Sequence, residues 1–170
     1  MNNAHLHLLL NHLPVLGSVL GLFLLIFSLW RKSIEIKRVS LVVFVLTAMS
    51  LVPTYLTGEP AEEMVEHLPG VSEALVGQHE SAALVALSAA LATGVVALAG
   101  LILLWRKNSL PVWLALATLF LAVASSTLMA RTANLGGQIR HTEIRSGSSS
   151  QQEQNNEKHD EKREHEKEGG

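Results

Sequence analysis

One uncharged apolar stretch constrains the fold more than any other feature of this chain. It runs for 24 residues, from Ala82 to Trp105, and is followed by Arg106 and Lys107. A helix rises 1.5 Å per residue, so about 20 apolar residues cross the roughly 30 Å hydrocarbon core of a bilayer. The stretch is therefore predicted to be a transmembrane helix.

Small residues follow one face of this predicted helix. Steps of four or three residues from His79 reach Ala83, Ala86, Ala90, Gly94 and Ala97. Small side chains on one face of a membrane helix allow another backbone or a flat ligand to come close. If the helix continues unbroken through His79, the imidazole lies at the mouth of that face.

Three other apolar runs have a similar length, which gives predicted spans of about 8–30, 39–56, 80–105 and 110–132. The expected fold class is all-α: a transmembrane four-helix up-down bundle formed by residues 1–145. In the first span, Gly17 and Gly21 form a G-x-x-x-G pair, which is typical of close helix packing. Gly136 and Gly137 are expected to break the helix after the last span.

The connection between the second and third spans contains its own short pattern. Ala61, Met64, Val65 and Leu68 recur at i, i+3, i+4 and i+7. This spacing predicts a short amphipathic helix that lies on the membrane surface.

The composition conceals two unlike parts. The chain is 48% hydrophobic and 16% charged, yet residues 146–170 hold almost no apolar side chain. That tail is expected to be disordered, because it has too little apolar surface to bury.

The chain has no cysteine, which excludes disulfides, thiolate metal sites and covalent haem attachment. No basic face is present, so nucleic acid is not an expected partner.

Basic residues concentrate in two of the connections. The segment from Thr57 to Glu80 has no Lys or Arg and holds six glutamates. The basic residues near the other two connections are Arg31, Lys32, Lys37, Arg38, Arg106 and Lys107. The positive-inside rule places those connections in the cytoplasm of a bacterial inner membrane, and both termini outside.

Six histidines then fall on the outer side of the membrane. They are His5, His7, His12, His67, His79 and His141. Neutral imidazole ligates haem iron and most transition metals. We predict a cofactor site, such as b-type haem, with His12 and His79 as ligands and His141 as a third candidate. The alternative is that these histidines are interfacial polar residues without a ligand.

A second candidate site lies in the acidic connection. Glu59, Glu63 and His67 are spaced i, i+4 and i+8, so they share one face of a helix. Carboxylates with histidine bind Zn²⁺, Mn²⁺ or Fe. The alternative is a solvated acidic face. No catalytic residues are predicted, because motifs such as H-E-x-x-H and G-x-S-x-G do not occur.

Four short motifs in this order resemble a known group of proteins. They are His12-Leu13-Pro14-Val15, Thr57-Gly58, Gln78-His79-Glu80 and the segment from Gly136 to His141. The pattern is similar to that of a bacterial four-span membrane protein family of unknown function, some of whose relatives are associated with c-type cytochrome domains. The resemblance covers roughly residues 5–145 and implies a respiratory or redox setting.

Two further functions stay open at this point. The protein is either a cofactor-free accessory or scaffold subunit that docks a periplasmic partner, or a small metal-binding membrane protein. Membrane lipids are expected contacts in every case. A periplasmic cytochrome or another membrane subunit is the expected protein partner, and a homo-oligomer is also compatible with the sequence.

Overall fold

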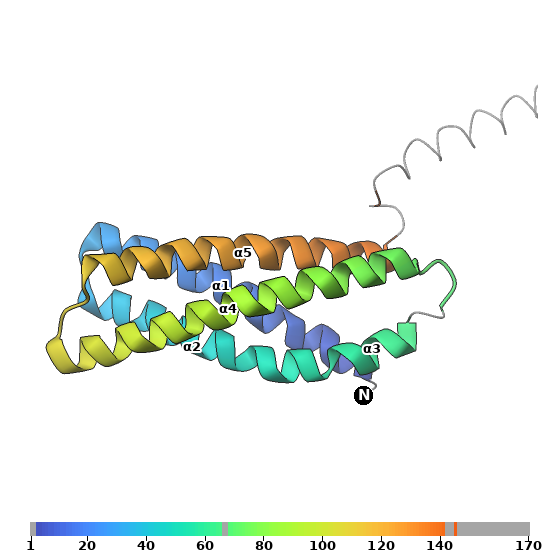
Figure 1. Cartoon of the computed structure of the whole chain (residues 1–170), viewed down its shortest axis with the longest axis horizontal. Helices are drawn as coiled ribbons and strands as arrows, with labels where there is room; N and C mark the ends of the chain where they lie inside the picture. Colours follow the sequence, from blue (N-terminus) through green and yellow to red (C-terminus); the bar gives the residue numbers. More distant parts are fainter. Residues whose placement is uncertain (1–2, 66–67, 142–144, 146–170) are drawn as a thin grey trace, which may run out of the picture.

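The computed structural model describes residues 3–65, 68–141 and 145, and that part of the chain is helical without strands. Four long helices lie side by side, and a short fifth helix sits at one end (Figure 1). The helices are α1 (Asn3–Arg31), α2 (Ile34–Leu56), α3 (Gly58–Val65), α4 (Glu73–Lys107) and α5 (Val112–Arg140). The all-α up-down bundle and the short helix of the long connection are confirmed. The tail from residue 146 onward lies outside the described residues.

The long helices have a fixed order around the bundle. Each helix packs against the next in the series α1, α2, α4 and α5, and α5 packs back against α1. Helices α1 and α4 therefore occupy opposite corners. Helices α1 and α4 begin at one end of the bundle, and α2 and α5 end there. We call this end the α3 end. The opposite end, with the connections 31–33 and 108–111, is the basic end.

Glycines allow the helices to approach closely. A Cβ atom at Gly21 would lie 2.6 Å from Cε1 of Phe44 on α2, and one at Gly17 would collide with the side chain of Thr47. A Cβ atom at Gly94 on α4 would collide with the side chain of Ala48 on α2. The G-x-x-x-G pair and the small stripe of α4 are thus confirmed as packing surfaces, since small residues let membrane helices meet at short range.

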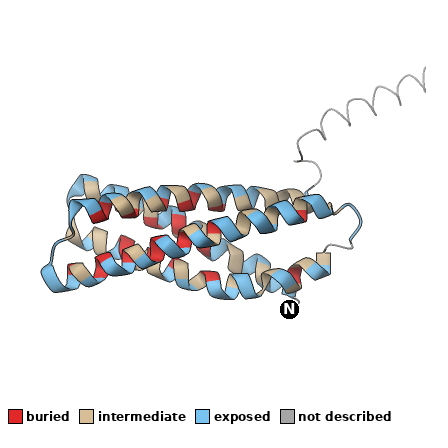
Figure 2. Cartoon of the chain, in the orientation of Figure 1, coloured by how far each residue is buried: buried red, intermediate tan, exposed pale blue. Residues whose placement is uncertain are grey.

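The bundle buries several serines and threonines beside its apolar core, and it exposes many large apolar side chains. Ser40 and Thr118 are both 0% exposed, whereas Phe23 is 72% and Phe120 is 74% exposed. Two of the buried hydroxyls donate to backbone carbonyls: Ser40 Oγ donates across to Gly21 at 3.0 Å, and Thr118 Oγ1 donates to Leu114 within its own helix. Buried residues follow the interior faces of the helices, and the outer faces are exposed (Figure 2).

The exposure of large apolar side chains on the outer faces is expected where the surroundings are as apolar as those side chains. The four long helices are also long and apolar enough to cross a membrane, with mean hydropathies of 2.0–2.4 in their most apolar windows. The protein is a multi-pass integral membrane protein. Its outer helix faces contact lipid.

The last helix does not break at its paired glycines, which corrects the sequence-based expectation. Helix α5 continues through Gly136 and Gly137 to Arg140. Glycine costs about 1 kcal/mol in a helix relative to alanine, a penalty that tertiary packing readily overrides. Here Gly136 faces the imidazole of His79 on α4, where there is little space for a side chain.

Arg145 ties the end of α5 to the connection before α4. In the last turn of α5, its Nε donates to the carbonyl oxygen of Gln138 at 2.8 Å, and its Nη2 donates to that of Ile139 at 3.0 Å. The same side chain donates to the carbonyl of Gly70 at 2.8 Å. The last carbonyls of a helix lack helical partners, so this arginine satisfies two of them and anchors the α3 end.

Candidate functional site: a histidine pair at the α3 end

His79 lies in the second turn of α4 and faces α5. Its Nδ1 atom is 3.0 Å from the carbonyl oxygen of Thr132. The ring is half-buried, and a Cβ atom at Gly136 would lie 3.0 Å from its Cε1 and 3.3 Å from its Nδ1. The absence of a side chain at residue 136 is what leaves room for the imidazole between the two helices.

His7 holds the corresponding position between α1 and α2. Its Nδ1 atom lies 3.1 Å from the carbonyl oxygen of Thr54 and 3.1 Å from Oγ1 of Thr57. The Thr57 hydroxyl itself donates to the carbonyls of Pro53 and Thr54, so it accepts from the imidazole. His7 is half-buried at the same end of the bundle as His79.

The two imidazoles lie at the same end of the bundle, although they come from helices at opposite corners. A backbone carbonyl can only accept a hydrogen bond, so Nδ1 must carry the proton in both rings. The lone pair is then on Nε2, which is the atom able to ligate a metal or haem iron.

The structure separates His12 from this pair. His12 is exposed on α1, and its Nδ1 lies 2.6 Å from the carbonyl oxygen of Leu8 in the same helix. His7, which the sequence analysis did not single out as a ligand, takes the interior position instead. The missed signal is a seven-residue spacing: His7, Pro14, Gly21 and Ser28 share one face of α1, and the last three are buried.

The other predicted residues lie elsewhere. His141 is exposed directly after α5, where its backbone N–H donates to the carbonyl of Gly137 at 3.0 Å. Glu59 and Glu63 are exposed on α3, and His67 lies outside the described residues. Across residues 3–65, 68–141 and 145, no three His, Cys, Asp or Glu side chains are grouped so as to hold a metal ion.

Comparison with known proteins adds no relative. No family model, no curated protein and no solved structure matches this chain.

Proposed function

We propose that the protein binds a b-type haem at the α3 end, where His7 and His79 would ligate the iron, and that it carries electrons in a respiratory or redox system of the membrane. The observation that carries this proposal is that the two imidazoles form the same kind of hydrogen bond. Each Nδ1 donates to a backbone carbonyl oxygen of a neighbouring helix. Metal-ligating histidines generally donate their second N–H in this way, because it fixes the ring orientation and makes the other nitrogen a better ligand.

The chain's own residues suit such a group. Two imidazoles are sufficient for haem iron, whereas protein sites for a bare metal ion use three or four protein ligands. The carbonyls of Thr54 and Thr132 orient the rings, and Gly136 leaves space beside His79. Small buried residues, Ala86 and Ala90, continue the interior face of α4 below the pair. A bound haem would supply one-electron chemistry.

A visible spectrum of the purified protein tests this proposal. The full chain is expressed with a haem precursor, purified in mild detergent, and measured before and after dithionite. We expect a Soret band that shifts on reduction in the wild type and in His12→Ala. We expect the band to be lost in His7→Ala and His79→Ala, because each removes one axial ligand.

The outcomes separate the candidate cofactors. A wild-type protein that stays colourless when haem is supplied contradicts the proposal. A band that depends on His12 and not on His7 would restore the ligand pair expected from the sequence. A colourless protein that carries stoichiometric metal by elemental analysis would make it a small metal-binding membrane protein.

A cofactor-free scaffold is the second candidate, and a specific observation favours it. His7 joins α1 to α2 and His79 joins α4 to α5 through the same hydrogen bonds, so both imidazoles also act as links between helices. In that case His79→Ala lowers the free energy of unfolding by about 1 kcal/mol, the usual contribution of one hydrogen bond, and changes no absorbance.

The orientation in the membrane belongs to the same proposal. The α3 end has exposed carboxylates at Glu59, Glu63, Glu73 and Glu80. The Lys and Arg residues that flank the connections lie at the basic end. By the positive-inside rule, we infer that the α3 end faces the periplasm of a bacterial inner membrane. A periplasmic cytochrome or another membrane subunit would then exchange electrons with the histidine pair.

A further inference from the structure

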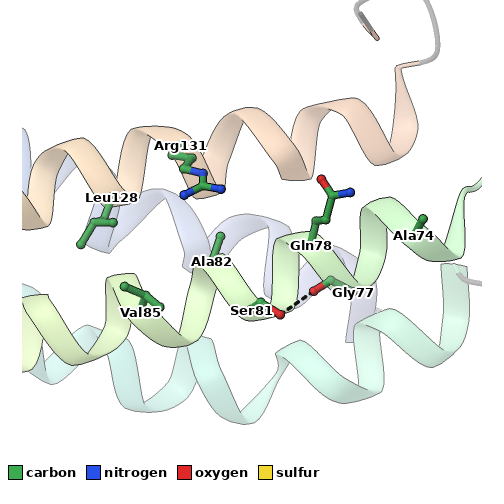
Figure 3. A pocket seen from close by; sticks show the side chains of 8 residues that line it. All are labelled: Ala74, Gly77, Gln78, Ser81, Ala82, Val85, Leu128 and Arg131. Carbon is green, nitrogen blue, oxygen red and sulfur yellow. Dashed lines mark hydrogen bonds between the residues drawn. The ribbon is translucent and has the colours of Figure 1, made fainter.

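A groove opens between α4 and α5 near the α3 end. It has a volume of about 420 Å³ and is lined by Ala74, Gly77, Gln78, Ser81, Ala82, Val85, Leu128 and Arg131. Figure 3 shows the Arg131 side chain extending from α5 toward α4, opposite Ala82, and the Gln78 side chain extending from α4 toward α5 farther along the helices. The groove therefore has a polar, cationic part and an apolar part.

The position of the groove along the helices matches a bilayer boundary. Arg131 is about 27 Å along the axis of α5 from Trp113, at 1.5 Å per residue, which is close to the thickness of the hydrocarbon core. Tryptophans favour the membrane interface, so Trp113 marks the boundary at the basic end. Arg131 then lies at the opposite boundary, where lipid headgroups begin.

The two parts of the groove fit the two parts of a lipid. Val85 is 54% exposed and, with Leu128, forms the apolar wall on the hydrocarbon side of Arg131. Arg131 is exposed and forms no ion pair or hydrogen bond within the described part of the chain. A guanidinium binds phosphate oxygens with two parallel N–H donors. Gln78, which also lines the groove, offers a further amide donor.

We propose that this groove binds an anionic phospholipid, with the phosphate on Arg131 and Gln78 and an acyl chain along Ala82, Val85 and Leu128. The site is separate from the histidine pair, and its occupation does not depend on a haem. Because Gln78 precedes His79 and Arg131 precedes Thr132, the lipid would lie beside the hydrogen bond that holds the His79 ring.

Native mass spectrometry of the full chain in detergent tests the groove. The protein is titrated with phosphatidylglycerol and, separately, with phosphatidylcholine. We expect at least one retained phosphatidylglycerol and about tenfold weaker binding in Arg131→Gln, since a charge-assisted hydrogen bond of this kind is worth about a factor of ten or more. Phosphatidylcholine is expected to bind more weakly than phosphatidylglycerol.

Arg106→Gln is the matched control, because Arg106 is an exposed arginine at the basic end of α4, away from the groove. Equal loss of lipid in both variants would show a general effect of charge and overturn the site. Ala82→Phe, which fills the groove without changing charge, is expected to reduce binding as well, and unchanged binding would also overturn it. Inorganic phosphate should not compete at millimolar concentration; displacement of the lipid by phosphate would instead identify a free anion as the ligand.

Discussion

The imidazole of His79 lies against a helix position where even a methyl group would be crowded. A Cβ atom at Gly136 on α5 would be 3.0 Å from Cε1 of the His79 ring. A Cβ atom at Gly77 on α4, two residues before His79, would have no neighbour within 4 Å. Alanine in place of glycine favours a helix by about 1 kcal/mol. We therefore expect Gly77→Ala to raise the free energy of unfolding by about that amount. Gly136→Ala should raise it less or lower it, because the ring must move away from Thr132. Unfolding of the purified protein in detergent measures both. Equal stabilisation by the two substitutions would mean that the ring is not held against α5.

The interior face of α1 provides a second test, at the scale of the helix pair. Gly21 lies against the ring of Phe44, which is only 3% exposed and has little freedom to move. We expect Gly21→Ala to destabilise the protein by about 1–3 kcal/mol, the usual cost of overpacking a filled interior. Leu20→Ala is the control, since Leu20 is 53% exposed and faces lipid; its effect should stay within about 0.5 kcal/mol. Titration with sodium dodecyl sulfate, followed by tryptophan fluorescence, compares the two. If the variants unfold alike, α1 and α2 do not meet at Gly21.

The sequence predicted the elements better than it predicted which residues share a site. The four spans and the small face of α4 follow from hydropathy and spacing alone. The continuation of α5 through Gly136 does not, because it depends on a contact with His79 from another helix. The proposed pairing of His79 with His7 also depends on how α1 is rotated. That rotation is encoded in the seven-residue repeat through Pro14 and Gly21, which a search for short motifs around His12 does not detect.

For the molecule as a whole, the charge at the two ends of the bundle predicts its orientation. Reporter fusions at Asn108, in the connection between α4 and α5, and after Gly170 should give opposite signals. The fusion at Asn108 is expected to report the cytoplasm, since basic connections are retained there. Like signals from both fusions would contradict the four-span arrangement. Opposite signals of the reverse sense would contradict only the orientation.

Helix α4 is longer than the membrane it crosses. His79 is about 39 Å along its axis from Trp105, at 1.5 Å per residue, whereas the hydrocarbon core is about 30 Å thick. The His79 ring, which is hydrogen-bonded to Thr132 next to Arg131, therefore lies at the headgroup boundary and not among the lipid tails. A group bound at this depth would be accessible from the membrane–water interface, so a water-soluble protein could approach it without entering the bilayer.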